Sequence, residues 1–281
     1  MFPVGLSSCG KTVDATLFDA YRSSGITHME LSMNVKGYEA LDFKATEALA
    51  KNYGVTLWSL HLPFAPFETY DPSRTTLCKA TLAYFKELIA KGSAVGIRNF
   101  VVHASGEPIP ETDRAERMKC AKESMADLAE IADSYGGTVC VEDLPRTCLG
   151  RNSSDILELI SLNDQLRVCF DTNHLLHEDN VDFVRAVGKK IVTTHVSDYD
   201  FVDEKHWLPG EGKVDWQALV QALKDVGYNG PWLYEIGFEC PNTLWRERDL
   251  TCEDFANNAA EIFENRPPHV LSKPKSNNTK P

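Results

Sequence analysis

The sequence lacks long apolar runs. No stretch approaches the roughly 18 apolar residues that a membrane-spanning helix needs. The start, MFPVGLSSCG, has no basic region followed by an apolar segment. Eight cysteines occur without a CxxC pair, scattered through expected strands and helices rather than packed into a short secreted framework. We therefore expect a cytoplasmic protein with reduced thiols and no membrane partner.

Basic residues are scarce relative to acidic ones. The chain has 29 Lys and Arg against 41 Asp and Glu, a formal net charge of −12. A surface with this balance repels a polyanion unless a local basic face compensates. We therefore expect no nucleic-acid partner.

Short apolar runs alternate with longer amphipathic segments along the chain. The helical period is clearest at residues 75–96 and 112–136, where Thr112 is the expected N-cap and Gly136 the expected end. Eight strand-like runs in 281 residues predict a single-domain α/β fold, a (β/α)8 TIM barrel. The eight runs are residues 3–9, 26–33, 55–64, 98–105, 138–145, 167–174, 190–198 and 232–239.

The predicted catalytic domain covers residues 1–264, and residues 265–281 are expected to form a flexible tail. This tail, NRPPHVLSKPKSNNTKP, is polar and punctuated by prolines, with four basic residues and no acid. Its charge leaves open a weak attraction for phosphate.

Ionisable side chains stand at the ends of seven of these eight runs. In a TIM barrel the carboxyl ends of the strands form the rim where chemistry takes place, and the strands are otherwise apolar. Alternation places Glu142 on the same face as Cys140, and Asp171 on the same face as Cys169, so the polar groups converge above an apolar layer. The residues are Glu30, His61, His103, Glu142, Asp171 with His174, His195 and Glu235.

Taken singly, these residues have ordinary structural explanations. An acid such as Asp171 after a strand is most often a helix N-cap, and a lone histidine such as His61 or His103 is most often a satisfied core residue. The joint occurrence of several carboxylates and imidazoles instead favours a divalent-metal site, because oxygen and nitrogen ligands of this kind suit such ions. Trp58, Trp207 and Trp245 either line a sugar-sized pocket or pack in the core.

Several motifs carry a resemblance over the chain before the tail. They are ED at 142–143, FDTNH at 170–174, THVSD at 194–198, EKHWLPGEGKVDW at 204–216 and YE at 234–235. In this order they resemble the xylose-isomerase-like TIM barrels, specifically the sugar and sugar-phosphate isomerase/epimerase group. Within the last long motif, Asp215 also has a structural explanation as a helix cap.

The resemblance implies one divalent ion, with manganese first and cobalt, magnesium or zinc as alternatives. By the same resemblance, Glu142, Asp171, His195 and Glu235 would hold the ion, and His174 would face the substrate. Glu142 and Glu235 would be the acid and base that move a proton beside a carbonyl, with the ion stabilising the enediolate as a Lewis acid. The other expected substrate-binding residues are His61, His103, Glu30, Lys205 and His206, the last two standing where related ketose epimerases often have arginine. For Glu30 a second role stays open, in which it only orients a neighbouring ligand.

Two other activities remain open on this scaffold. The same proton abstraction ends in elimination in related inosose dehydratases and in lyases that cleave 3-keto-glycosides, including C-glycosides. Abasic-site endonucleases on this barrel bind three zinc ions through nine ligands, and a matching residue type occurs here at each place, with Glu204 among them. The charge of −12 counts against a DNA substrate. We expect a small carbohydrate as the ligand, and a homo-oligomer or a partner subunit that completes the pocket.

Overall fold

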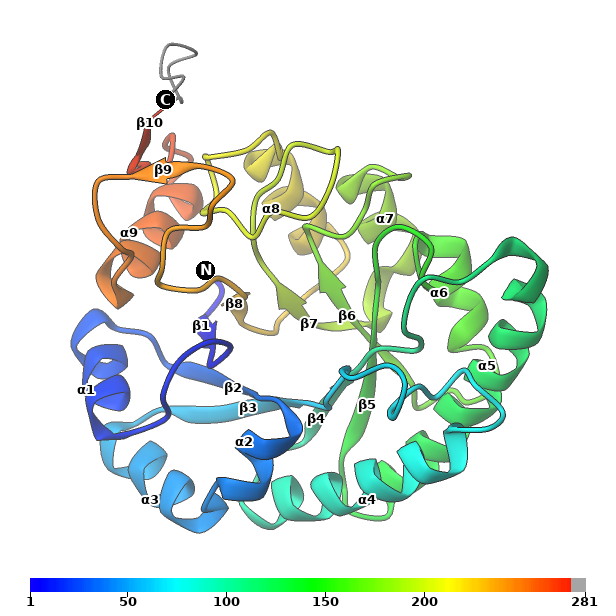
Figure 1. Cartoon of the computed structure of the whole chain (residues 1–281). Coiled ribbons are helices and arrows are strands. Elements are labelled where there is room, and N and C mark those ends of the chain that lie inside the picture. The colour runs from blue at the N-terminus through cyan, green and yellow to red at the C-terminus, as the bar shows by residue number, and fades with distance from the viewer. Residues whose placement is uncertain (274–281) are drawn as a thin grey trace, which may run out of the picture.

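A computed structural model describes residues 1–273 of the chain. Each expected apolar run contains one strand, and helices surround the strands (Figure 1). The strands are β1 (Val4–Ser7), β2 (His28–Ser32), β3 (Thr56–His61), β4 (Asn99–Val102), β5 (Thr138–Glu142), β6 (Arg167–Asp171), β7 (Ile191–His195) and β8 (Trp232–Tyr234).

These strands form one parallel sheet in the order β7-β6-β5-β4-β3-β2-β1-β8. The two ends of this sheet meet through Val196, whose N–H donates to the Leu233 carbonyl at 2.8 Å. The carbonyl of Val196 accepts from the N–H of Glu235 at 3.3 Å. The sheet thereby closes as a barrel, and the predicted α/β fold is confirmed.

The connecting helices follow the capping signals of the sequence. Asp14, Asp42, Asn152, Asp179 and Asp215 each accept a hydrogen bond from an N–H in the first turn of a helix, which satisfies donors that have no intrahelical partner. The helices are α1 (Ala15–Ser24), α2 (Val35–Ala40), α3 (Phe43–Tyr53), α4 (Cys78–Ala94), α5 (Glu111–Asp133), α6 (Ser153–Leu159), α7 (Asn180–Val187), α8 (Trp216–Asp225) and α9 (Cys252–Phe263), with a 3-10 turn η1 at Gly188–Lys190.

The expected N-cap of the second long helix was wrong. Helix α5 begins at Glu111 after Pro110, and Thr112 lies within its first turn, where its hydroxyl donates to Asp113 at 2.9 Å. Pro110 occupies the N-cap position with φ −61° and ψ 143°, and its side chain has no group that could cap the helix. Gly136 adopts a φ of 68° just after the helix, as the stop signal predicts.

Two apolar layers hold the barrel. The larger lies between the strands and the helices, where for example Phe170 of β6 stacks on Phe183 of α7 with ring centroids 5.2 Å apart. The smaller lies inside the barrel and consists of Val101, Cys140 and Cys169. The polar rim residues stand above this inner layer, so the lower part of the barrel is packed and the upper part is open to chemistry.

The first residues of the expected tail contact the barrel. The N–H of His269 donates to Glu261 of α9 at 2.6 Å, and Ser272–Lys273 (β10) pairs antiparallel with Trp245–Arg246 (β9). The backbone of residues 265–273 therefore has hydrogen-bond partners on the barrel. The remaining part of that tail, residues 274–281, lies outside the described residues.

No helix among residues 1–273 is both long enough and apolar enough to span a bilayer.

Candidate active site

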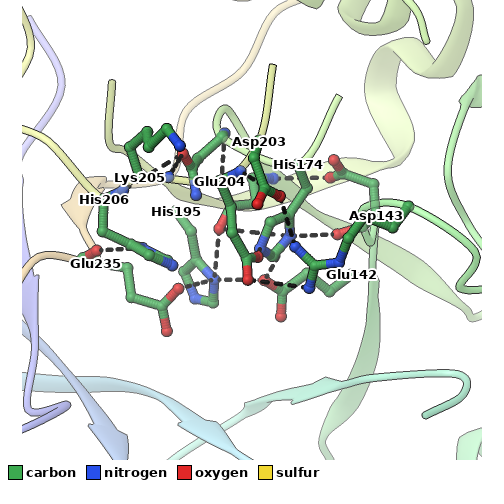
Figure 2. Close-up of polar contacts among 12 residues, drawn as sticks. Glu142, Asp143, His174, His195, Asp203, Glu204, Lys205, His206 and Glu235 are labelled. Atoms are coloured by element: carbon green, nitrogen blue, oxygen red, sulfur yellow. Dashed lines mark hydrogen bonds and ion pairs between the residues drawn. The ribbon is translucent and has the colours of Figure 1, made fainter. Parts of the chain in front are cut away.

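The predicted ligands converge at the carboxyl ends of the strands. Glu142, Asp171 and His195 are the last residues of β5, β6 and β7, and Glu235 directly follows β8. Glu142, Asp171 and His195 are fully buried, whereas Glu235 reaches the cavity. Figure 2 shows Glu142, His195 and Glu235 with their side chains gathered above the barrel.

His195 lies at the centre of this group of four. Its Nδ1 is 2.9 Å from Glu142 Oε1, 3.5 Å from Glu235 Oε2 and 3.9 Å from Asp171 Oδ2. One donor atom from each of the four residues lies within 4.8 Å of all the others. The structure therefore brings together the four residues that the sequence predicted as ligands.

The donor set fits a divalent metal ion. Three carboxylates and one imidazole are ligands of the hard-to-borderline type that manganese, magnesium, cobalt and zinc accept. Asp171 Oδ2 is buried within this set and has no hydrogen-bond partner among the described residues. Because an unpaired buried carboxylate oxygen is costly, its position favours a cation at this point.

The second oxygen of Glu142 faces two further histidines. Glu142 Oε2 is 3.0 Å from His61 Nε2 and 3.2 Å from His103 Nε2. The Nδ1 of His61 contacts the carbonyl of Leu62 at 2.8 Å, and since a carbonyl only accepts, this nitrogen carries a proton. His61 therefore presents Nε2 toward the site in a fixed orientation.

His174 and His206 are held in the same way. His174 Nδ1 donates to the carbonyl of Asp143 at 2.8 Å, and its Nε2 lies 3.3 Å from Glu204. His206 Nδ1 donates to the carbonyl of Glu235 at 3.1 Å. His174, Glu204 and His206 form another group whose donor atoms lie within 4.8 Å of one another. Figure 2 shows these three side chains near one another.

Glu30 supports the site from below. Its Oε2 accepts a hydrogen bond from Ser59 at 2.8 Å and contacts His195 Nε2 at 3.0 Å. It is fully buried and does not line the cavity. Of the two roles that the sequence left open for Glu30, orientation of a neighbouring ligand fits this position.

The pKa values of the site residues show that the clustered carboxylates favour positive charge beside them. Burial alone would lower the pKa of His61, but the hydrogen bond and charge of Glu142 outweigh it and raise that pKa to about 9. Burial raises the pKa of Asp171 to about 6. The hydrogen bond from His174 is the main cause that lowers the pKa of Glu204 to about 2. The clustered carboxylates thus retain protons on neighbouring imidazoles. A divalent cation would neutralise the same negative charge.

The loop between β7 and α8 folds around Asp198. The carboxylate of Asp198 accepts from the N–H of Gly210 at 2.7 Å and from Nε1 of Trp216 at 3.0 Å. A Cβ on Gly212 would lie 2.2 Å from Asp198 Oδ1, so only glycine fits there. This explains the PGEGKVDW segment structurally and fixes the loop that carries Glu204 and His206.

Some predicted pocket residues lie elsewhere. The amine of Lys205 is 3.9 Å from Asp200, and Lys205 does not line the cavity. None of the three candidate tryptophans lines it either: Trp58 donates to Thr193 inside the barrel, Trp207 donates to Thr243, and Trp245 is exposed on β9.

The cavity over the site has a volume of about 480 Å³ and contains residues that the sequence argument missed. Phe64 and Phe67 follow β3, Glu107 follows β4, and Arg146 follows β5. These residues lie in loops outside the alternating pattern, so no periodicity marks them. Their one shared signal is position shortly after a barrel strand.

A family model described as a xylose isomerase-like TIM barrel matches residues 18–252. The chain belongs to this family. The predicted family and fold are therefore confirmed.

Named relatives of this xylose isomerase-like barrel act on carbohydrates. The D-psicose 3-epimerase of Ruminiclostridium cellulolyticum is 24% identical over 214 residues, which cover 70% of this chain and 69% of that protein. The inosose isomerase of Bacillus velezensis is 26% identical over 160 residues, 53% of this chain but only 56% of the relative. A D-tagatose 3-epimerase-like protein superposes with a TM-score of 0.79 at 21% identity, over 94% of this chain and 96% of that one, and shows the shared fold. The names of the curated relatives agree with the expectation of an enzyme.

Proposed function

We propose that this protein is a divalent-metal-dependent isomerase or epimerase of a small carbohydrate. The observation that carries the proposal is the group of four donors from four strands, Glu142, Asp171, His195 and Glu235, within 4.8 Å of one another at the rim of the barrel. The names of the curated relatives support the same class of substrate. The first candidate for the ion is manganese, with cobalt, magnesium or zinc as alternatives.

The reaction moves a proton on a carbon beside a carbonyl. A bound divalent ion would act as a Lewis acid for the substrate oxygens and would be held by Glu142, Asp171, His195 and Glu235. Glu142 and Glu235 extend from different strands and contact the same nitrogen of His195, at 2.9 and 3.5 Å. Glu235 lines the cavity, and Glu142 is buried beside it. We assign one of them as the base that forms the enediolate and the other as the acid that returns the proton.

Histidines complete the polar wall of the pocket. His174 and His206 both line the cavity, each with Nδ1 fixed by a backbone carbonyl and Nε2 left for another partner. A hydroxyl of the substrate would replace the contact between His174 and Glu204. Because both rings are oriented before binding, little ordering is needed when the sugar enters.

The same residues would also support elimination. If the carbon next to the deprotonated carbon carries a good leaving group, the enediolate expels that group and a double bond forms between the two carbons instead of the proton being taken back. The lyase or dehydratase activity considered from the sequence therefore shares the site and differs in the substrate.

A second candidate function follows from the other donor groups. His61, His103 and Glu142 form one such group, and His174, Glu204 and His206 form another, beside the first group of four. Together these are the nine residues that match the trinuclear zinc endonucleases. A cluster of three ions would favour cleavage of a phosphodiester. The formal charge of −12 favours the carbohydrate instead.

The test is proton exchange in heavy water. The protein is loaded with Mn²⁺ and incubated in D₂O with D-fructose, D-psicose, D-tagatose or L-ribulose, and deuterium at the carbons beside the carbonyl is measured by mass spectrometry. Metal content is measured on the protein as purified and again after loading. About one ion per chain with deuterium incorporation supports the proposal, whereas about three zinc ions with no exchange would favour the phosphodiesterase.

Two variants serve as controls. Glu235→Gln removes one proton-transfer group and is expected to abolish exchange, while Lys205→Gln changes a side chain that faces Asp200 and is expected to retain it. Exchange that persists unchanged in Glu235→Gln would contradict the assignment of this residue.

A further inference from the structure

Arg146 is the one lysine or arginine that lines the cavity within residues 1–273. It follows β5 and has a φ of 53°, a left-handed conformation that non-glycine residues seldom adopt. Enzymes that act on sugar phosphates or sugar acids need a cation for the charged end of the substrate. Whether this pocket accepts an anion therefore depends on whether the guanidinium of Arg146 is free to bind it.

The guanidinium of Arg146 is already occupied. Its Nε is 3.0 Å from both carboxylate oxygens of Glu107, and its Nη2 also contacts Glu107. Its Nη1 is 2.8 Å from Asp203, and its Nη2 is 3.0 Å from Glu204. All three guanidinium nitrogens thus donate to carboxylates, which come from the loops after β4 and β7.

The cluster of Arg146, Glu107, Asp203 and Glu204 carries a negative charge. One guanidinium and three carboxylates sum formally to −2. His174, which lies 3.3 Å from Glu204, adds at most one positive charge, so the group stays negative. A phosphate or carboxylate at the mouth would meet like charge and would have to displace an existing partner of Arg146.

The other walls of the cavity suit an uncharged ligand. Phe64 stacks on His103 with ring centroids 4.6 Å apart and keeps 41% of its surface exposed. Phe67, Leu144 and Ile236 also line the cavity. Apolar walls of this kind contact the carbon faces of a sugar ring or an uncharged extension of it, while the polar rim binds the hydroxyls.

We infer that this pocket selects an uncharged carbohydrate and excludes sugar phosphates and sugar acids, because Glu107, Asp203 and Glu204 occupy the guanidinium of Arg146. This inference rests on the proposed function and narrows its substrate class. Arg146 is a specificity residue in this scheme, and its carboxylate partners decide whether the pocket binds an anionic substrate. Removal of those partners converts the same arginine into a binding site for an anion.

The experiment measures binding rather than turnover. D-fructose, D-fructose 6-phosphate and inorganic phosphate are titrated by calorimetry into the metal-loaded protein and into the Glu107→Gln/Asp203→Asn variant. In the unchanged protein, D-fructose 6-phosphate should bind at least about tenfold more weakly than D-fructose. In the variant, the affinity for both phosphate ligands should rise at least about tenfold, with D-fructose changed less than about threefold.

A matched variant identifies which side chain causes the increased phosphate affinity. Adding Arg146→Met to the double variant should remove the increased phosphate affinity, while phosphate bound at the metal would be unaffected by it. If the double variant does not fold, the single Asp203→Asn variant replaces it, since Asp203 is 48% exposed. Tighter binding of D-fructose 6-phosphate than of D-fructose by the unchanged protein would overturn the inference.

The inorganic phosphate series separates this inference from the proposed function. If no ketose binds but the variant gains phosphate affinity through Arg146, the sugar assignment fails and the occupied guanidinium still explains the exclusion of anions. If ketoses bind and exchange protons but the variant gains no phosphate affinity, the proposed function stands and the role of Arg146 is wrong.

Discussion

Two inner layers of the barrel lie two residues apart on the same strands and have opposite characters. In β5 and β6 the lower positions, Cys140 and Cys169, pack together with Val101 in a dry interior. The upper positions, Glu142 and Asp171, are equally buried but contact imidazoles. Both layers are inaccessible to solvent, so burial alone does not distinguish them. The lower layer follows the rule that interiors are apolar, and the upper layer departs from it at a cost in desolvation.

The two layers therefore have different roles: the lower layer stabilises the fold, and the upper layer serves function. A residue of the lower layer contributes through the contacts it fills, whereas an upper residue contributes little that an apolar side chain of similar size would not supply. The ionisable groups of the upper layer therefore have their explanation in chemistry. Substitutions at paired positions on one strand test this division.

The largest expected effect is at position 142 compared with position 140. Glu142→Gln should lower turnover of an accepted ketose by about 10²- to 10⁴-fold, because an amide neither accepts nor returns a proton at neutral pH. Cys140→Ala should leave turnover within about threefold and lower the free energy of unfolding by about 1–2 kcal/mol through lost packing. Steady-state kinetics and urea denaturation of both variants measure the two quantities. Equal losses of turnover in the two variants would remove the distinction between the layers.

The sequence was sufficient to place both layers. Strand alternation put Cys140 below Glu142 and Cys169 below Asp171, and the ends of the runs marked the rim. These features depend on residues close together in the chain, where a period of two has a direct geometric meaning. The barrel and the convergence of Glu235 with the rest followed from the parallel order of the strands.

The sequence was insufficient where partners come from distant loops. Nothing near Arg146 in the chain reveals that Glu107 and Asp203, 39 and 57 residues away, occupy its guanidinium. Residues 265–273 are polar and proline-rich, yet they contact the barrel because α9 and β9 offer backbone and carboxylate partners. Loop conformation depends on such tertiary contacts, which local pattern does not encode.

A smaller effect is expected from metal binding at position 171 compared with position 169. Mn²⁺ at about one hundred times its dissociation constant should stabilise the unchanged protein by about 2.7 kcal/mol, which raises the melting temperature by roughly 5 °C. Asp171→Asn should reduce this increase strongly, because a neutral amide is a weaker ligand than a carboxylate. Cys169→Ala should show a lower starting temperature and the full increase. Thermal denaturation with and without Mn²⁺ gives both values, and an undiminished increase in Asp171→Asn would exclude this residue as a ligand.

The smallest effect concerns Lys11, a half-buried cation at the rim that lies outside the donor groups. Its amine donates to the carbonyls of Ser7, Cys9 and Ile236 at 2.9, 3.2 and 2.8 Å, and burial lowers its pKa to about 8. The unfolded chain, with the ordinary lysine value of 10.5, retains a proton that the folded chain releases between these two values. Stability should therefore rise with pH above 8, by roughly 1–2 kcal/mol up to about pH 9.5.

Lys11→Met tests whether every charge held at the rim is functional. The methionine fills a similar volume and does not titrate, so the difference in unfolding free energy between the two proteins should change with pH by that amount, while Mn²⁺ still raises the melting temperature. Urea denaturation at several pH values gives this difference, and Cys9→Ser in both backgrounds controls for titration of the neighbouring thiol. A pH-independent difference would show that the three carbonyls keep Lys11 charged in the folded protein. Loss of the Mn²⁺ effect would instead make Lys11 part of the site, because its bond to Ile236 would then be what positions Glu235.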